Sequence, residues 1–126
     1  MRLTLTLAAA LAVGALALPA AAQTAPAGEG QYQDALRRMI VETAGGTCPD
    51  DIMGGPLLAA CQQQLPQMSA GLSSLGAVQT ITFVRAEDRP EGRVEIYEVV
   101  FAGGQSLNWG IGGEKDGKFD IAFAGG

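Results

Sequence analysis

The chain of 126 residues has no histidine, two cysteines and one tryptophan. Without histidine, neither a Ser-His-Asp triad nor a Cys-His pair can be built. General acid–base chemistry would then fall on carboxylates whose pKa values burial must raise. Two thiolates without other soft ligands make a poor zinc site, and the adjacent carboxylates of Asp50 and Asp51 fall far short of the roughly six to eight oxygens that Ca²⁺ prefers. We therefore expect no bound metal and no cofactor.

Basic residues are also scarce, since eight lysines and arginines stand against thirteen aspartates and glutamates. Nucleic-acid binding requires basic patches, so this balance argues against a nucleic-acid partner. It argues equally against an anionic membrane surface. An acidic, solvated surface that keeps a small protein soluble is the simplest interpretation of the charge.

The longest apolar run covers residues 3–18, directly after a basic start. Pro19 ends the run, and the small residues 20–22 form the pattern that signal peptidases recognise. We therefore predict a signal peptide over residues 1–22 and cleavage before Gln23. The run is shorter than the roughly 20 residues of a membrane-spanning helix. The expected product is a periplasmic or secreted protein that is not held by a membrane after cleavage, with seven basic and thirteen acidic residues and a net charge of −6.

Both cysteines, Cys48 and Cys61, lie in the predicted mature chain. In an oxidising compartment an isolated pair most simply forms one disulfide. The spacing is not the Cys-x-x-Cys of redox-active pairs, so we predict a structural bond. Chain entropy gives such a short loop a stabilisation of about 3 kcal/mol. The bond would fasten the loop that carries Cys48 onto the helix that carries Cys61.

Two helical patterns follow a flexible leader at residues 23–30, which has nothing to bury. Over residues 32–43 the apolar positions recur with the period of an amphipathic helix, and Gly45-Gly46 is a typical helix end. A second helix is predicted to begin with Pro56 in its first turn. Pro66 lies inside this second pattern and predicts a kink or a restart. The apolar stripe of the second helix is Leu58, Cys61, Leu65, Met68 and Leu72.

From Ala77 onward the apolar period changes to two, which is typical of strands. The predicted strands cover residues 78–87, 93–102 and 106–111, followed by a fourth in which Phe119, Ile121 and Phe123 alternate. Residues 112–118 are predicted to be a loop centred on the hairpin signal Asp116-Gly117. Two N-terminal helices packed on one face of a four-stranded antiparallel meander predict an α+β fold, with residues 31–126 forming a single domain.

Charged residues alternate along the first two predicted strands: Arg85, Glu87, Arg93, Glu95 and Glu98. The simplest interpretation is a set of exposed cross-strand ion pairs, each of which contributes little to stability. The alternative is a charged sheet face that binds a protein partner.

The second half of the chain also carries a string of short motifs. They are Leu75-Gly76-Ala77, Ile81-Thr82-Phe83, Tyr97-Glu98-Val99-Val100-Phe101, Trp109-Gly110-Ile111 and Asp116-Gly117-Lys118-Phe119. Over residues 75–123 this string resembles the cone-shaped α+β modules of the nuclear-transport-factor-2-like (SnoaL-like, cystatin-like) superfamily. It is similar, more narrowly, to the small domain that accompanies serine-hydrolase or β-lactamase-type domains in exported bacterial proteins. Gly110 departs from that pattern, in which a larger polar residue is expected, and the cysteine pair is not typical of the superfamily.

The resemblance implies a domain whose function its fold does not determine, because the superfamily includes enzymes, binders and interaction modules. It also implies a homodimer formed through the sheet. We predict an exported, non-catalytic domain that binds either a small apolar ligand between helices and sheet or a protein partner on the open sheet face. The expected ligand-binding residues are Met39, Leu65, Phe83, Tyr97 and Trp109. Trp109 would lie either in the core or at the mouth of the cone, where it could stack on a ligand.

The alternative function is a small SnoaL-like enzyme of the isomerase or hydrolase type. Enzymes of this kind use a pocket carboxylate as the base and tyrosine hydroxyls as donors to the oxyanion. The corresponding candidates are Asp34 as the base, with Tyr32 and Tyr97 as donors. Asp34 falls on the polar face of the first predicted helix, so we expect it to point outward.

Overall fold

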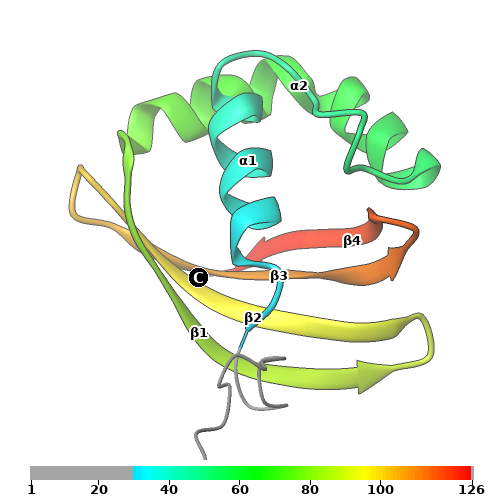
Figure 1. The fold of residues 1–126 in the computed structure, drawn as a ribbon. Helices are drawn as coiled ribbons and strands as arrows, with labels where there is room; N and C mark the ends of the chain where they lie inside the picture. The colour runs from blue at the N-terminus through cyan, green and yellow to red at the C-terminus, as the bar shows by residue number, and fades with distance from the viewer. Residues whose placement is uncertain (1–29, 126) are drawn as a thin grey trace, which may run out of the picture.

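The computed structural model describes residues 30–125, and the predicted signal peptide lies outside these residues. The described chain contains two helices and one four-stranded antiparallel sheet, as the α+β prediction requires. Helix α1 spans Gln33–Ala44 and α2 spans Gly55–Leu75, followed by strands β1 (Val78–Arg89), β2 (Gly92–Phe101), β3 (Ser106–Lys115) and β4 (Lys118–Gly125). The strands are ordered β1-β2-β3-β4, which is a meander. Figure 1 shows both helices on the same side of a curved sheet.

Helix α1 buries the face that its sequence period predicts, namely Leu36, Met39, Ile40 and Thr43. Its end is a Schellman motif, because the amide of Gly46 donates to the carbonyl of Thr43 and the amide of Thr47 donates to the carbonyl of Glu42. Gly46 has a φ of 97°, in the left-handed region that glycine tolerates. The glycine pair therefore ends the helix as predicted.

Helix α2 has Pro56 in its first turn and runs without interruption past Pro66. Of the two alternatives predicted at Pro66, a kink or a restart, the restart is therefore wrong. The hydroxyls of Ser69 and Ser73 both donate to the carbonyl of Ala44, at 2.9 and 3.0 Å. These bonds fix the last turns of α2 against the end of α1. No helix among the described residues is long and apolar enough to cross a membrane.

The third strand is longer than predicted. β3 continues to Lys115, so most of the predicted 112–118 loop is sheet. Only Asp116 and Gly117 form the turn, and both have positive φ, 54° and 84°, as a two-residue type I′ hairpin requires. The strand can continue because Gly112 pairs with Val94 on one side and with Ile121 on the other.

The core lies between the helices and one face of the sheet. Tyr97, Val99 and Phe101 share this face, as the period of two predicts, and all three are fully buried. The other buried members of the core are Leu36, Met39, Ile40, Met53, Cys61, Leu72, Ile81, Trp109, Ile111 and Phe119.

The fourth strand does not keep its three large residues on one face. Phe119 is buried in the core against Tyr32, with 4.8 Å between the ring centroids, whereas Phe123 is 41% exposed. The ring of Phe123 lies over Gly110 of β3. Gly113, which lies between the positions that face Phe119 and Ile121, has a φ of 67° and interrupts the regular pleat. The predicted alternation is wrong here because it assumed an unbroken pleat.

Candidate ligand-binding cavity

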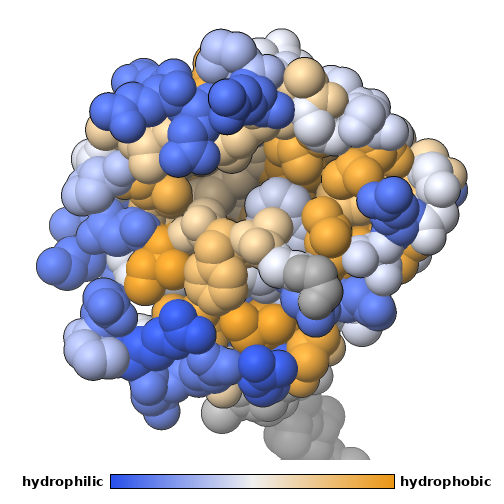
Figure 2. Space-filling model, turned by 180° about the vertical axis from the view of Figure 1, so that it is seen from behind, coloured by the Kyte–Doolittle hydropathy of each residue, from blue (hydrophilic) through white to orange (hydrophobic). Residues whose placement is uncertain are grey.

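A cavity of about 490 Å³ lies between the two helices and the β3–β4 half of the sheet. Small-molecule sites typically measure about 300–1,000 Å³. Figure 2 shows a hollow bordered by hydrophobic side chains and rimmed by hydrophilic ones. The cavity is lined by Leu36, Met39, Ile40, Thr43, Met53, Leu57, Ala60, Cys61, Gln64, Met68, Gly71, Leu72, Leu107, Trp109, Ala122, Phe123 and Ala124.

Small residues keep this space open. Ala60 and Gly71 lie on the face of α2 that lines the cavity, and a Cβ atom added to Gly71 would meet nothing within 4 Å. On the sheet side, Ala122 pairs with Ile111 and Ala124 pairs with Trp109. Interiors are otherwise close-packed. A methyl group or a hydrogen at each of these four positions leaves the volume that larger side chains would occupy.

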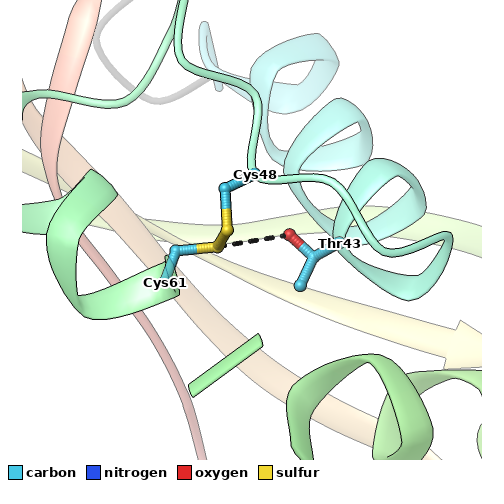
Figure 3. The surroundings of a disulfide bond; sticks show 3 residues. All are labelled: Thr43, Cys48 and Cys61. Carbon is cyan, nitrogen blue, oxygen red and sulfur yellow. Dashed lines mark hydrogen bonds between the residues drawn. A yellow bond between two sulfur atoms is a disulfide. The ribbon is translucent and has the colours of Figure 1, made fainter. Parts of the chain in front are cut away.

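Every methionine among the described residues, Met39, Met53 and Met68, lines the cavity. Methionine is unbranched and polarizable, so such a lining adapts to ligands of different shape. The cavity wall is also fixed covalently, because Cys61 forms the predicted disulfide with Cys48, with an S–S distance of 2.04 Å (Figure 3). The hydroxyl of Thr43 lies 3.8 Å from Sγ of Cys61 and can donate to it.

Trp109 carries the one buried side-chain nitrogen or oxygen of the described residues that has no hydrogen-bond partner, Nε1. The residue is 9% exposed and lines the cavity. A buried N–H group without an acceptor costs about 1–3 kcal/mol, and tryptophan usually finds a partner for this group when buried. Nε1 is itself buried, so the indole contributes its ring to the cavity wall.

The described lining residues include no charged side chain; their polar groups are the Thr43 hydroxyl, the Gln64 amide and the Trp109 N–H. The described residues likewise contain no group of three or more His, Cys, Asp or Glu side chains that could hold a metal ion. Asp51 of the predicted acidic pair instead forms a two-pronged ion pair with Arg38, at 2.8 and 2.9 Å. The hydrogen bonds from Arg38 hold the pKa of Asp51 below its usual value.

Of the five residues predicted to bind a ligand, Met39 and Trp109 line the cavity. Phe83 and Tyr97 pack edge-to-face in the core, with their ring centroids 5.6 Å apart, and do not line it. Leu65 is half-buried on α2 and is also outside the lining. The sequence could not reveal the small lining residues. A search for apolar stripes selects large apolar side chains, whereas a cavity forms where side chains are small.

The three candidate catalytic residues do not meet in this cavity. Asp34 is exposed on the first turn of α1, as its place on the polar face predicts. Tyr32 is half-buried and packs against Phe119. Burial and the hydrogen bond to Glu95 raise the pKa of the Tyr97 hydroxyl far above its ordinary value. None of the three lines the cavity.

Glu95 is completely buried, although the sequence pattern predicts it in an exposed ladder of ion pairs. Its Oε1 accepts hydrogen bonds from the amides of Gln31 (2.8 Å) and Tyr32 (2.9 Å) and from the hydroxyl of Tyr97 (2.6 Å). Its Oε2 accepts from Nε of Arg93 at 2.7 Å. Burial acts to raise the pKa of Glu95, but these hydrogen bonds outweigh it and hold the pKa below the usual value. The carboxylate fastens the chain that enters α1 to the sheet.

The rest of the predicted ladder is exposed or partly exposed. Glu87 forms ion pairs with Arg85 (2.9 Å) and Arg89 (2.6 Å). The guanidinium of Arg89 also lies 5.5 Å from the ring centroid of Phe123. This cluster covers the face of the sheet opposite the helices, and its charges largely pair with one another.

No protein-family model, curated protein or solved structure matches this chain. The candidate site therefore stands on its own geometry: a preformed apolar cavity with a disulfide in its wall. The disulfide indicates a compartment other than the cytoplasm, because thiols in the cytoplasm are kept reduced.

Proposed function

We propose that this protein is an exported, non-catalytic domain that binds a small apolar ligand in the cavity between the two helices and the β3–β4 half of the sheet. The observation that carries the proposal is the cavity itself, whose volume of about 490 Å³ is kept open by Ala60, Gly71, Ala122 and Ala124. The side chains that line an apolar cavity of this size lack the packing contacts of a close-packed interior. Occupation by a ligand would restore those contacts.

The expected affinity is modest. Each methylene group transferred from water into the cavity contributes about 0.8 kcal/mol. A ligand with about ten such groups would gain roughly 8 kcal/mol, against association costs of at least about 4 kcal/mol. The net gain is then at most about 4 kcal/mol, which corresponds to a dissociation constant of about 1 mM and sets the concentrations for a binding experiment.

Export is part of the proposal. The predicted signal peptide at residues 1–22 and the Cys48–Cys61 disulfide both favour a periplasmic or secreted protein. The resemblance to nuclear-transport-factor-2-like modules is compatible with a cavity between helices and a curved sheet. It adds no ligand.

The two alternatives have weaker support. An enzyme of the SnoaL-like type needs a carboxylate in the pocket, and Asp34, Asp50 and Asp51 are all exposed. A protein partner on the open sheet face would meet charges that already pair with one another around Glu87.

The test is the fluorescence of N-phenyl-1-naphthylamine, a neutral apolar probe, titrated with the purified exported protein. The protein should enhance the fluorescence with saturation. Gly71→Phe places a ring in the open space beside Gly71 and should weaken the enhancement at least tenfold. Ala70→Phe adds the same ring at the exposed neighbouring position and should leave it unchanged. Equal enhancement by all three proteins, or none by the unsubstituted protein, would contradict the proposal.

A further inference from the structure

We infer that the ligand of the cavity is an extended, uncharged peptide segment that adds to the free edge of β4 as a fifth strand and inserts apolar side chains beside Ala122 and Ala124. The inference rests on the proposed function, because it uses the same cavity, and it names the chemical class of the ligand. In strand addition, main-chain hydrogen bonds provide affinity and pockets for alternate side chains provide specificity.

The backbone phase of the sheet is fixed at the β2–β3 turn. In an antiparallel pair, residues that exchange hydrogen bonds alternate with residues whose N–H and C=O groups point away from the partner strand. The amide of Phe101 donates to the carbonyl of Gln105 at 2.9 Å, in the register that continues along β2 and β3. The odd-numbered residues of β3 up to Ile111 therefore bond to β2, and the even-numbered ones, including Gly110, bond to β4.

This phase leaves backbone groups of β4 free. Gly110 pairs with Phe123, so the two neighbours of Phe123 point their N–H and C=O groups away from β3. These neighbours are Ala122 and Ala124, and β4 is the last strand of the sheet. Among residues 30–125, no backbone or side-chain group forms a hydrogen bond with these outward groups. The edge therefore offers donors and acceptors to an added strand.

The start of the same edge already carries a short strand segment. The amide of Phe119 donates to the carbonyl of Ile52 at 2.9 Å, and the amide of Gly54 donates to the carbonyl of Phe119 at 2.8 Å. Met53 lies between these two bonds and forms a parallel bridge with Phe119. The chain then turns into α2, which begins at Gly55. A peptide at Ala122 and Ala124 would continue the pairing along the edge.

The free edge also borders the mouth of the cavity. Both alanines line the cavity, and Ala124 is exposed. The exposed lining residues on the α2 side of the mouth are Ala60, Gln64 and Gly71. Figure 2 shows the hollow open at the surface. Side chains directly opposite each other on paired strands share a face. Alternate side chains of an added strand, about 7 Å apart, would therefore point into the cavity beside the two alanines.

The two edges of the sheet differ in what they present to another strand. β1 has a register shift after Phe83 and four charged residues, Arg85, Glu87, Asp88 and Arg89. Bulges and charges of this kind prevent strand addition. The last part of β4, residues 121–125, carries neither a charge nor a proline. The lining residues are uncharged as well, so a charged side chain entering the cavity would find no partner there. The inward side chains of the peptide are therefore apolar.

A second copy of this chain fits the edge less well. If two copies paired through β4, the side chains placed beside Ala122 and Ala124 would be the alanine methyl groups of the other copy, which share their phase. Two methyl groups would leave most of a cavity of about 490 Å³ unfilled. A peptide with larger apolar side chains at alternate positions fills it.

Two capped, neutral pentapeptides of identical composition test the inference. In acetyl-Ser-Leu-Ser-Leu-Ser-amide the leucines alternate, and in acetyl-Ser-Ser-Leu-Leu-Ser-amide they are adjacent. The alternating peptide should displace N-phenyl-1-naphthylamine from the purified exported protein. The adjacent peptide should do so at least tenfold more weakly, because only one of its leucines can face the cavity at a time.

Hydrogen exchange measured by NMR reports the strand pairing directly. In the free protein the amides of Ala122 and Ala124 should exchange quickly, whereas those of Ile121 and Phe123, which bond to β3, should exchange slowly. The alternating peptide should slow the exchange of both alanine amides at least tenfold. N-phenyl-1-naphthylamine has no peptide backbone and should not slow it.

A matched pair of proline variants tests the edge. Ala124→Pro removes an outward N–H and keeps the bonds to β3, so it should weaken binding of the alternating peptide at least tenfold in calorimetry. Ala86 of β1 pairs with Glu95, whose backbone bonds to β3, so the N–H of Ala86 points to the other free edge. Ala86→Pro should therefore bind the peptide as the unsubstituted protein does. Should either variant not fold, the exchange rates of the unsubstituted protein decide the question.

The outcomes separate the inference from the proposed function. If the probe binds but the alternating peptide does not, or if the peptide binds without slowing the alanine amides, the inference is wrong and the proposed function stands. Slower exchange without displacement of the probe would place the peptide outside the cavity and also overturn the inference. Alanine amides that exchange more slowly as the protein concentration rises, without peptide, would assign the edge to a second copy. If neither the probe nor the peptide binds, the proposed function fails as well.

Discussion

The hydroxyl of Tyr97 donates a 2.6 Å hydrogen bond to Oε1 of Glu95, and both side chains are fully buried. The same carboxylate oxygen accepts hydrogen bonds from the backbone amides of Gln31 and Tyr32. Gly30 lies against the Tyr97 hydroxyl so closely that a Cβ atom has no room there. This pair therefore holds the start of α1 on the sheet, and α1 forms one wall of the cavity.

Replacement of Glu95 by glutamine should lower the free energy of unfolding by about 2–4 kcal/mol. The glutamine amide has only one acceptor oxygen. It cannot accept a hydrogen bond from Arg93 in addition to those that Oε1 of Glu95 accepts. Glu98→Gln is the matched control, since Glu98 is exposed on the same strand, and it should change stability by less than about 0.5 kcal/mol. Urea denaturation of the three proteins at neutral pH measures the difference. Equal losses for the two variants would mean that the buried network contributes nothing specific.

The same network predicts how stability depends on pH. The native pKa of Glu95 lies below its unfolded value of about 4.3. The contribution of Glu95 to the free energy of unfolding is thus complete above its unfolded pKa. It is lost as the pH falls through the native pKa. The native pKa of Tyr97 is raised above its unfolded value of about 10, so its contribution is complete below that pH and is lost at higher pH.

Urea midpoints measured from about pH 2 to pH 11 should therefore decline at both ends. Glu95→Gln should flatten the acid decline, and Tyr97→Phe should flatten the alkaline one. An acid decline of unchanged slope in Glu95→Gln would show that other carboxylates, such as those of Asp51 and Glu87, account for it.

The contact between Phe123 and Gly110 predicts a rescue experiment. A methyl group at position 110 would collide with the ring of Phe123, so Gly110→Ala should destabilise the protein by about 1–3 kcal/mol. Adding Phe123→Ala removes the obstacle, and the double variant should be more stable than the sum of the two single changes predicts.

Gly112 supplies the control, because the obstacle there includes the backbone carbonyl of Arg93. Gly112→Ala should destabilise the protein at least as much as Gly110→Ala, and Phe123→Ala should not relieve it. Rescue at both positions, measured by thermal unfolding, would contradict this assignment of the two contacts.

The disulfide should contribute about 3 kcal/mol to stability, since it closes a loop between cysteines 13 residues apart. The double variant Cys48→Ala/Cys61→Ala should show a correspondingly lower urea midpoint. Intact-mass analysis of the exported protein should show the loss of residues 1–22 and of two further hydrogens. A mature chain with two free thiols would contradict the predicted bond.

The sequence predicted the elements whose signals are local. The helical period of residues 32–43, the glycine pair after it and the Asp116-Gly117 turn each depend on a few neighbouring residues, and each prediction is confirmed. The loop predicted at 112–118 was too long, because β3 continues to Lys115 and Gly112 lies in the strand where the neighbouring backbone approaches closely.

The site was harder to predict for two reasons. Glu95 shares the phase of Tyr97, Val99 and Phe101, so the period of two does indicate an inward side chain, but its charge favoured an exposed one. The cavity depends on small residues that come together only in the fold, such as Gly71 and Ala124. No local pattern indicates which small residues face each other.

The most direct test of the central claim uses the ε-methyl groups of the methionines, labelled with ¹³C. Met39, Met53 and Met68 all line the cavity. On titration with N-phenyl-1-naphthylamine, all three methyl resonances should shift with one saturation curve and show nuclear Overhauser contacts to the ligand's aromatic protons. Contacts confined to the opposite sheet face around Glu87, or methionine resonances that do not move while the ligand binds, would contradict the account.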